Sequence, residues 1–159
     1  MTDAESAASA PAERVRELLE AVVQGLGLDA AIDIVERGEE IEATLRGEEL
    51  ALAIGRHGQT IDAIQHLAFK VAVQGEAQPY RVAVDAAGYR ARRRAILERQ
   101  ADEAADAAER TKRAVALDAM NAGERKVVHE YLKARPGIDT YSEGTEPERH
   151  LVVAPLRST

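Results

Sequence analysis

The chain contains no cysteine and no tryptophan, and only one phenylalanine and four tyrosines among its 159 residues. The absence of cysteine excludes disulfides and thiolate metal ligands, and it fits a reducing compartment. Four scattered histidines give no metal-ligand spacing, so we expect neither a metal nor a cofactor. The few aromatic side chains argue against a surface rich in stacking platforms.

Long apolar runs are also absent. No stretch approaches the roughly 20 consecutive apolar residues of a membrane-spanning helix. The acidic, Ala-rich N-terminus lacks the basic and then apolar segments of a signal peptide. An apolar fraction of 45% is nevertheless enough for packed cores. The sequence therefore predicts a cytoplasmic protein without membrane insertion, built as one ordinary domain or two small ones.

Familiar catalytic patterns are missing too. The sequence has no Ser-His-Asp order, no paired-carboxylate pattern, no H-E-x-x-H string and no lysine in a phosphate-binding loop of the G-K-[ST] type. We therefore expect a binding protein and no enzyme.

The net charge of −7 argues against a phosphate-bearing partner. The charges are, however, unevenly distributed along the chain. Residues 1–50 hold 4 basic and 13 acidic side chains, whereas residues 51–100 hold 8 basic and 4 acidic ones. Residues 101–159 hold 9 basic and 11 acidic side chains. Either the middle of the chain contacts an anionic ligand, or the acidic surface serves solubility and the basic excess is local variation.

Hydrophobic periodicity predicts the order helix, strand, strand, short helix, helix, strand in the first half of the chain. Residues 1–10 are small and polar and are expected to form a disordered lead. The expected ranges are 11–26 for the first helix, 30–35 and 40–46 for a hairpin, 48–54 for the short helix, 59–75 for the next helix and 79–85 for the third strand.

The tetrad Gly55, Arg56, His57 and Gly58 lies between the short helix and the longer one that follows. The two glycines carry no Cβ, so main-chain N–H groups can approach an anion while Arg56 supplies charge. The following helix adds free N–H donors and the positive end of its dipole. A G-x-x-G string also marks ordinary turns, and the tetrad alone is therefore weak support for phosphate binding.

A long helical pattern extends from about residue 87 to residue 116, with a basic first turn and an acidic middle. The helix dipole favours acidic residues at the N-terminus, so Arg90, Arg93 and Arg94 suggest a use beyond helix stability. They either reach an anionic ligand or form a solvated face.

A further helix is expected after Asn121, with Glu124 three residues on as the partner of a capping box. Arg125, His129 and Lys133 follow at helical spacing and predict a cationic stripe, with Lys126 beside it. Two strands around a polar turn are expected over residues 140–144 and 149–155.

The first six elements, with the tetrad between two helices, resemble a type II KH domain over residues 11–86. In KH domains the G-x-x-G loop holds the backbone of single-stranded nucleic acid beside an apolar groove. The resemblance implies that residues 55–58 form the clamp. The residues that it places along the groove are Ile54, Gln59, Thr60, Ile61 and Ile64; packing in the core is the alternative for the isoleucines.

Residues 87–159, including the long helix, resemble the R-three-H domain, which is named for an Arg-x-x-x-His helix and associated with single-stranded nucleic acid. Here Arg125 and His129 match that motif, and Thr140-Tyr141-Ser142-Glu143-Gly144 follows it. The order of the two domains resembles the bacterial Jag family, also called the SpoIIIJ-associated or KhpB family. The expected fold is α+β, with two small domains joined by a long helix.

The resemblance implies binding of single-stranded RNA, or of single-stranded DNA, and a post-transcriptional role linked to cell elongation and division. It also implies a small single-KH protein, KhpA, as a partner. A protein–protein adaptor in which nucleic-acid binding is secondary remains the alternative. His129 contacts phosphate, braces its own domain, or does both. Many family members carry an additional N-terminal Jag domain, whereas this chain begins almost at the KH domain, so the resemblance does not extend to functions that depend on that domain.

Overall fold

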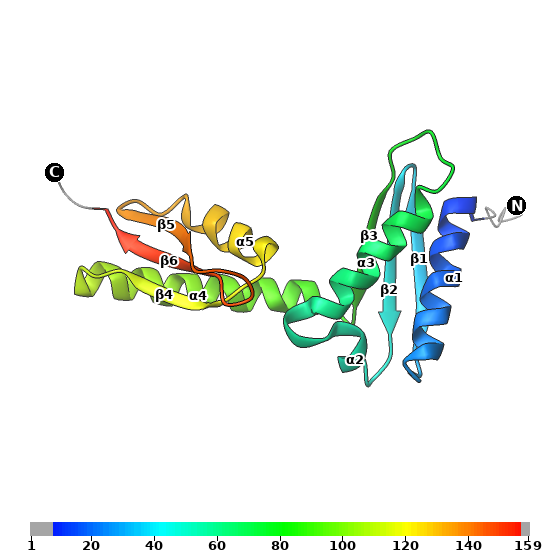
Figure 1. Cartoon of the computed structure of the whole chain (residues 1–159), viewed down its shortest axis with the longest axis horizontal. Helices are drawn as coiled ribbons and strands as arrows, with labels where there is room; N and C mark the ends of the chain where they lie inside the picture. The colour runs from blue at the N-terminus through cyan, green and yellow to red at the C-terminus, as the bar shows by residue number, and fades with distance from the viewer. Residues whose placement is uncertain (1–7, 157–159) are drawn as a thin grey trace, which may run out of the picture. The chain divides into compact units, whose positions relative to one another are not determined.

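The computed structural model describes residues 8–156 and has an α+β fold with two compact units, Met1–Arg90 and Ala91–Thr159 (Figure 1). The expected fold class is therefore confirmed. Each unit has its own sheet and its own buried cluster.

The first unit contains the predicted order of helices and strands. Its elements are α1 (Ala10–Gly25), β1 (Ala31–Arg37), β2 (Glu40–Arg46), α2 (Ala51–Ile54), a 3-10 turn η1 (Arg56–Gly58), α3 (Gln59–Ala72) and β3 (Arg81–Ala86). Helix α1 begins at Ala10, because the Ser9 hydroxyl accepts a hydrogen bond from the Ala12 N–H at 3.3 Å. Of the lead expected over residues 1–10, residues 1–7 lie outside the described part of the chain.

A three-stranded sheet in the order β1-β2-β3 supports this unit. Strands β1 and β2 form an antiparallel hairpin, and β3 pairs with β2 in parallel. Ile41, Ala43 and Leu45 alternate along β2 and are buried, together with the apolar faces of α1 and α3. Both helices therefore cover one face of the sheet, and the tetrad follows α2 at the start of α3.

Arg14 of α1 ties that helix to the C-terminal end of α3. Its guanidinium donates to the carbonyl oxygens of Val71 at 2.7 Å and Ala72 at 2.8 Å, and it forms an ion pair with Glu76 at 2.7 Å. These carbonyls belong to the last turn of α3, where carbonyl oxygens have no N–H donor within the helix. A polar side chain of the first helix thus completes the end of another helix.

The second unit is built on helix α4 (Tyr89–Thr111), whose first two residues belong to the first unit. Strand β4 (Val115–Ala119), helix α5 (Ala122–Leu132), strand β5 (Ile138–Glu143) and strand β6 (His150–Pro155) complete it. The sheet is antiparallel in the order β4-β6-β5. Its core joins the Ala-rich face of α4 to Val128 and Leu132 of α5 and to Leu151 and Val153 of β6.

The expected helix over residues 87–116 is wrong at its C-terminal end. Helix α4 stops at Thr111, Lys112 adopts a φ of 58°, and Val115 begins strand β4. The alanines at 101–108 favour helix, and the sequence offers no glycine or proline near residue 112 to show where it ends. Val115 pairs with Val153 of β6, so pairing with a distant strand decides the conformation there.

Candidate functional site

The tetrad forms a tight left-handed turn between α2 and α3. Gly55 has φ 72° and ψ 178°, His57 has φ 52° and ψ 28°, and Gly58 has φ 76° and ψ 13°. The Gly58 N–H donates weakly to the Gly55 carbonyl at 3.3 Å. The backbone angles thus show that the tetrad interrupts the helical conformation between α2 and α3.

Both glycines are needed for space as well as for backbone conformation. A Cβ at Gly55 would lie 2.8 Å from the Cβ and 2.9 Å from the backbone nitrogen of Thr60. A Cβ at Gly58 would lie 2.7 Å from the ring of Tyr89. The start of α3 and the Tyr89 ring therefore pack directly against the loop, which keeps it close to the body of the first unit.

The two residues between the glycines face solvent. Arg56 and His57 are both exposed, and no hydrogen bond within residues 8–156 engages their side chains or their backbone N–H groups. No side chain caps α3, so its positive dipole end also stays open. The loop thus presents a cation, an imidazole and free N–H donors together, which is a local arrangement suited to an anion.

The residues expected along an apolar groove divide into two groups. Ile61 and Ile64 lie in the core of the first unit, so burial assigns them to packing. Ile54 and Thr60 are half-buried, and Gln59 is exposed. Of the five, only these last three have side-chain surface near the loop.

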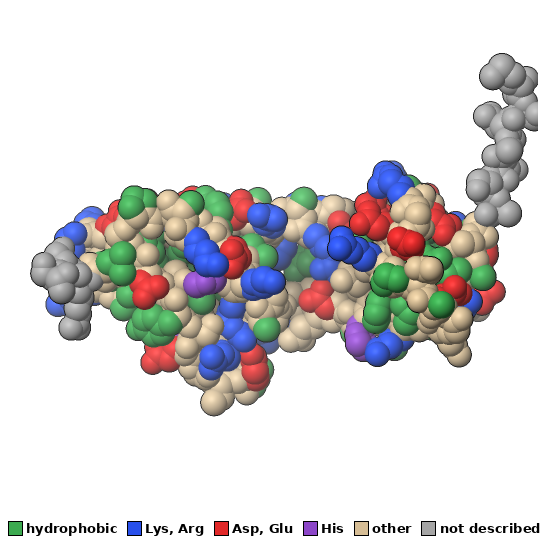
Figure 2. All heavy atoms as spheres, turned by 90° about the horizontal axis from the view of Figure 1, so that it is seen from above, with side chains coloured by type: hydrophobic (Ala, Val, Ile, Leu, Met, Phe, Trp, Pro, Cys, Tyr) green, Lys and Arg blue, Asp and Glu red, His purple; other side chains and the backbone are tan. Residues whose placement is uncertain are grey.

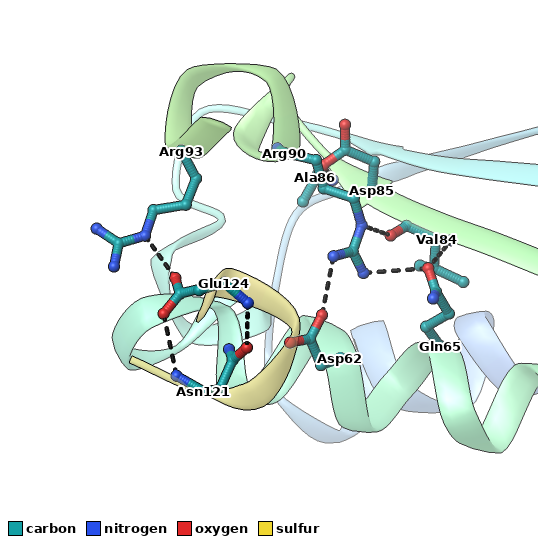
Figure 3. A network of polar contacts seen from close by, with 9 residues as sticks. All are labelled: Asp62, Gln65, Val84, Asp85, Ala86, Arg90, Arg93, Asn121 and Glu124. Atoms are coloured by element: carbon teal, nitrogen blue, oxygen red, sulfur yellow. Dashed lines mark hydrogen bonds and ion pairs between the residues drawn. The ribbon is translucent and has the colours of Figure 1, made fainter. Parts of the chain in front are cut away.

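Arg90, expected as an auxiliary RNA contact, is engaged within the first unit (Figure 3). It donates to the Val84 carbonyl at 2.9 Å, to Asp62 at 2.8 Å and to Gln65 at 3.1 Å. The Gln65 carbonyl oxygen also accepts from the Val84 N–H at 2.9 Å. Arg90 therefore joins α3 to β3 just after the loop. Sequence analysis missed Asp62 and Gln65, because polar residues on an exposed helix face carry no sign of a distant partner.

The capping box expected at the start of α5 is confirmed. The Asn121 side chain accepts from the Glu124 N–H at 2.9 Å, and Glu124 Oε2 accepts from the Asn121 N–H at 3.3 Å. Within the same unit, Arg93 Nε donates to Glu124 Oε1 at 2.6 Å (Figure 3). Arg93 of α4 thus fixes the first turn of α5 through a buried carboxylate, next to Arg125.

Arg125 and His129 of the Arg-x-x-x-His motif both make contacts inside the second unit. Arg125 is only 9% exposed; its Nη1 donates to the Met120 carbonyl at 2.6 Å, and its Nη2 lies 2.9 Å from Glu146 Oε1. His129 Nδ1 lies 2.5 Å from Thr140 Oγ1 on β5. Of the predicted cationic stripe, Arg125 is therefore a buried member. The expected alternative, in which His129 braces its own unit, is met by the Thr140 contact.

The remaining basic residues differ in how strongly they are engaged. Arg94 pairs with Glu98 at 2.8 Å, and Lys133 pairs with Glu130 at 2.8 Å. The Lys133 ammonium lowers the pKa of Glu130 through this hydrogen bond. Lys126 is exposed, and no ion pair engages it among the described residues. Sequence analysis missed Glu146, because a polar turn gives no sign of which residue has a distant partner.

Charges of both signs are interspersed on the face drawn in Figure 2. Any anion contact on such a surface must be local, because a broad basic field is missing from that face. No helix in residues 8–156 is long and apolar enough to cross a membrane. The same residues contain no group of three His, Asp or Glu side chains placed to hold a metal ion.

Comparison with known proteins supports the assignment of both units. A family model described as the KhpA/KhpB KH domain matches residues 12–84, and one described as the R-three-H domain matches residues 95–155. A Clostridium symbiosum protein named RNA-binding protein KhpB is 33% identical over 144 residues, which is 89% of this chain and 65% of the relative.

Two further relatives carry the same name. The Bacillus subtilis protein is 31% identical over 149 residues, 92% of this chain and 72% of the relative. The Lactiplantibacillus plantarum protein is 37% identical over 138 residues, 87% of this chain and 43% of the relative. The chain thus spans less than two thirds of the length of the Clostridium and Lactiplantibacillus proteins.

Proposed function

The chain belongs to the KhpB family, and we propose that it binds single-stranded RNA by holding phosphates at the 55–58 loop and at the Arg-x-x-x-His helix. The relatives are named RNA-binding proteins. The observation that carries the proposal is the 55–58 loop itself, where Arg56 and His57 are exposed and their N–H groups have no partner among the described residues, at the uncapped start of α3.

The loop fits a phosphate for electrostatic and steric reasons. Phosphate oxygens accept hydrogen bonds from N–H groups, and the guanidinium of Arg56 matches them in a forked geometry. The glycines let the backbone come close, because no Cβ stands in the way. Ile54, Gln59 and Thr60 then lie where a base next to the held phosphate would pass, while Ile61 and Ile64 support the loop from the core.

In the second unit, Arg125 and His129 form the proposed second phosphate contact, with Lys126 as a nearby charge. Thr140 orients the His129 ring, and the Met120 carbonyl holds one side of the Arg125 guanidinium. Arg94 and Lys133 are weaker candidates because each forms an ion pair with a glutamate, Glu98 and Glu130 respectively. Arg90 and Arg93 are not proposed as phosphate contacts, because Arg90 is bonded to α3 and Arg93 to the first turn of α5.

The test is the binding of a short fluorescent oligouridine to the native chain and to an Arg56→Asp, His57→Asp variant. The substitutions place two carboxylates where a phosphate should lie, so affinity should fall at least tenfold. Because both side chains are exposed, the variant should melt at the same temperature as the native chain. Equal affinity of two folded proteins would contradict the phosphate clamp.

An adaptor that pairs with another KH protein is the second candidate. Leu52 of α2 is 63% exposed and Leu67 of α3 is 50% exposed, and large exposed apolar side chains are typical of contact surfaces. A Leu52→Ser, Leu67→Ser variant that loses a KhpA-type partner but keeps RNA would support this function alongside the clamp. Loss of the partner in the Arg56→Asp, His57→Asp variant would instead place pairing at the loop.

We further propose a cytoplasmic, post-transcriptional role linked to cell elongation and division. It is supported by family resemblance, and a deletion strain complemented with the native or the loop variant tests it. Restoration of normal cell length by the native chain alone is the expected result.

A further inference from the structure

The carboxylate of Glu146, an exposed residue, forms an ion pair with the nearly buried Arg125. The Arg125 side chain is 11% exposed, and its two terminal nitrogens have different partners. Nη1 donates to the Met120 carbonyl at 2.6 Å, and Nη2 lies 2.9 Å from Glu146 Oε1. The Glu146 side chain is 59% exposed. One side of the guanidinium is therefore fixed by backbone, and the other is covered by a carboxylate that lies mostly in solvent.

A carboxylate and a phosphate compete for the same donor. Both present anionic oxygens that a guanidinium binds through N–H groups at about 2.7–2.9 Å. The Met120 carbonyl engages Nη1 and the exposed Glu146 carboxylate lies at Nη2, so a phosphate that binds the Nη2 side of the guanidinium has to displace that carboxylate. The two anions also repel each other, so they cannot share Nη2 without loss.

We infer that Glu146 is a built-in competitor for phosphate, and that RNA gains Arg125 by displacing the Glu146 carboxylate. The inference rests on the proposed RNA-binding function and adds the residue that sets the affinity of the second contact. Glu146 thereby lowers the affinity for every anion and leaves Arg125 neutralised when no RNA is bound.

The structure allows this displacement without unfolding of the turn. Glu146 lies in residues 144–149, between β5 and β6. The ends of that turn are fixed independently: Arg149 donates to the Gly144 carbonyl at 2.6 Å, and the Met120 N–H donates to the Arg149 carbonyl at 3.0 Å. The Glu146 side chain can thus rotate into solvent while these backbone contacts stay in place. Water reaches the carboxylate end of this ion pair and screens its attraction to the guanidinium.

Glu148 supplies a matched control. It lies two residues away in the same turn and is exposed, and no ion pair engages its carboxylate among the described residues. Glu148→Gln removes the same charge as Glu146→Gln without touching Arg125. A difference between the two variants therefore reports the contact and not the net charge.

The experiment measures oligouridine affinity for the native chain, Glu146→Gln and Glu148→Gln at one low salt concentration. We expect Glu146→Gln to bind about three- to fivefold more tightly than the native chain, because the phosphate no longer has to displace a carboxylate from Arg125. Glu148→Gln should stay within about twofold of the native affinity, because it changes only a screened charge.

Each other outcome overturns the inference. Equal affinities of Glu146→Gln and Glu148→Gln, with measurable native binding, reject Glu146 as a competitor and leave the proposed function standing. Weaker binding by Glu146→Gln would mean that Glu146 holds Arg125 in position and does not compete with RNA. A lower melting temperature of the variant would agree with that structural role. Absence of binding by all three proteins overturns both the inference and the proposed function.

Discussion

Gly55 and Gly58 are both required in the loop, but for different physical reasons. The φ and ψ of Gly55, 72° and 178°, belong to a region that is essentially restricted to glycine, and the backbone of Thr60 blocks the position of a Cβ. Gly58 has angles that other residues adopt at a modest cost, and its Cβ would meet the Tyr89 side chain. Gly55 should therefore tolerate substitution less well.

Gly55→Ala is expected to lower the free energy of unfolding by about 1–3 kcal/mol, the cost of such a backbone conformation in a residue with a Cβ. Urea denaturation measures this change. Gly25→Ala is the control. Gly25 ends α1 and has no positive φ, and a Cβ at this position would have no atom within 4 Å. A loss in Gly25→Ala as large as that in Gly55→Ala would contradict the account.

Motif spacing identified Arg125 and His129 but not their surroundings. An i, i+4 spacing shows that two side chains share a helix face, and it does not show what that face packs against. The Met120 carbonyl and the Thr140 hydroxyl come from segments before and after α5. The burial of Arg125 and its contact with Glu146 therefore depend on the tertiary fold, beyond the reach of a local pattern.

Helix α3 begins at the candidate site, and its other end is held by Arg14 of α1. Arg14 binds two terminal carbonyl oxygens and Glu76, whereas Arg16 on the same helix makes one long contact, to the Ile32 carbonyl at 3.4 Å. The periodic pattern predicted both helices well, because each has a clear apolar face. Nothing in that pattern shows that a polar residue of α1 caps α3.

Arg14→Met is expected to cost about 2 kcal/mol of unfolding free energy, because hydrogen bonds to a charged group are lost and two carbonyls lose their donor. Arg16→Met should change it by less than about 0.5 kcal/mol, because Arg16 loses only one long hydrogen bond. Chemical denaturation of both variants checks the difference. Equal losses would show that Arg14 does not act as a cap.

Arg135, just after α5, makes a pH-dependent connection to α4. It donates to Asp106 at 2.5 Å and to Glu109 at 2.9 Å. The hydrogen bond from Arg135 holds the pKa of Glu109 below its ordinary value of 4.5. A carboxyl whose pKa is lower in the folded state stabilises the fold above pH 4.5, and this stabilisation is lost as the pH falls through the folded pKa.

The stability of the native chain should therefore exceed that of Arg135→Gln at pH 7, and the difference should shrink as the pH falls below 4.5. Thermal melting of both proteins from pH 7 to pH 3 measures this. Arg149→Gln is a control, because Arg149 donates to a backbone carbonyl and not to a titrating group. A difference between native and Arg135→Gln that is constant with pH would contradict the ion-pair account.

For the molecule as a whole, sequence analysis predicted the fold class, the order of the elements in the first unit and both motifs. It missed β4, because pairing with β6 outweighs the helical preference of the preceding alanines. The net charge of −7 does not prevent binding of RNA, since the proposed contacts are a few local cations and N–H groups. Affinity should accordingly depend on salt with a shallow slope.

The measurement that tests the central proposal most directly is an amide and arginine side-chain NMR titration of the native chain with oligouridine. The account predicts shifts of the Arg56, His57 and Gly58 amides and of the Arg125 guanidinium, all following one saturating binding curve. RNA binding with shifts elsewhere, and none at residues 55–58 or at Arg125, would contradict it.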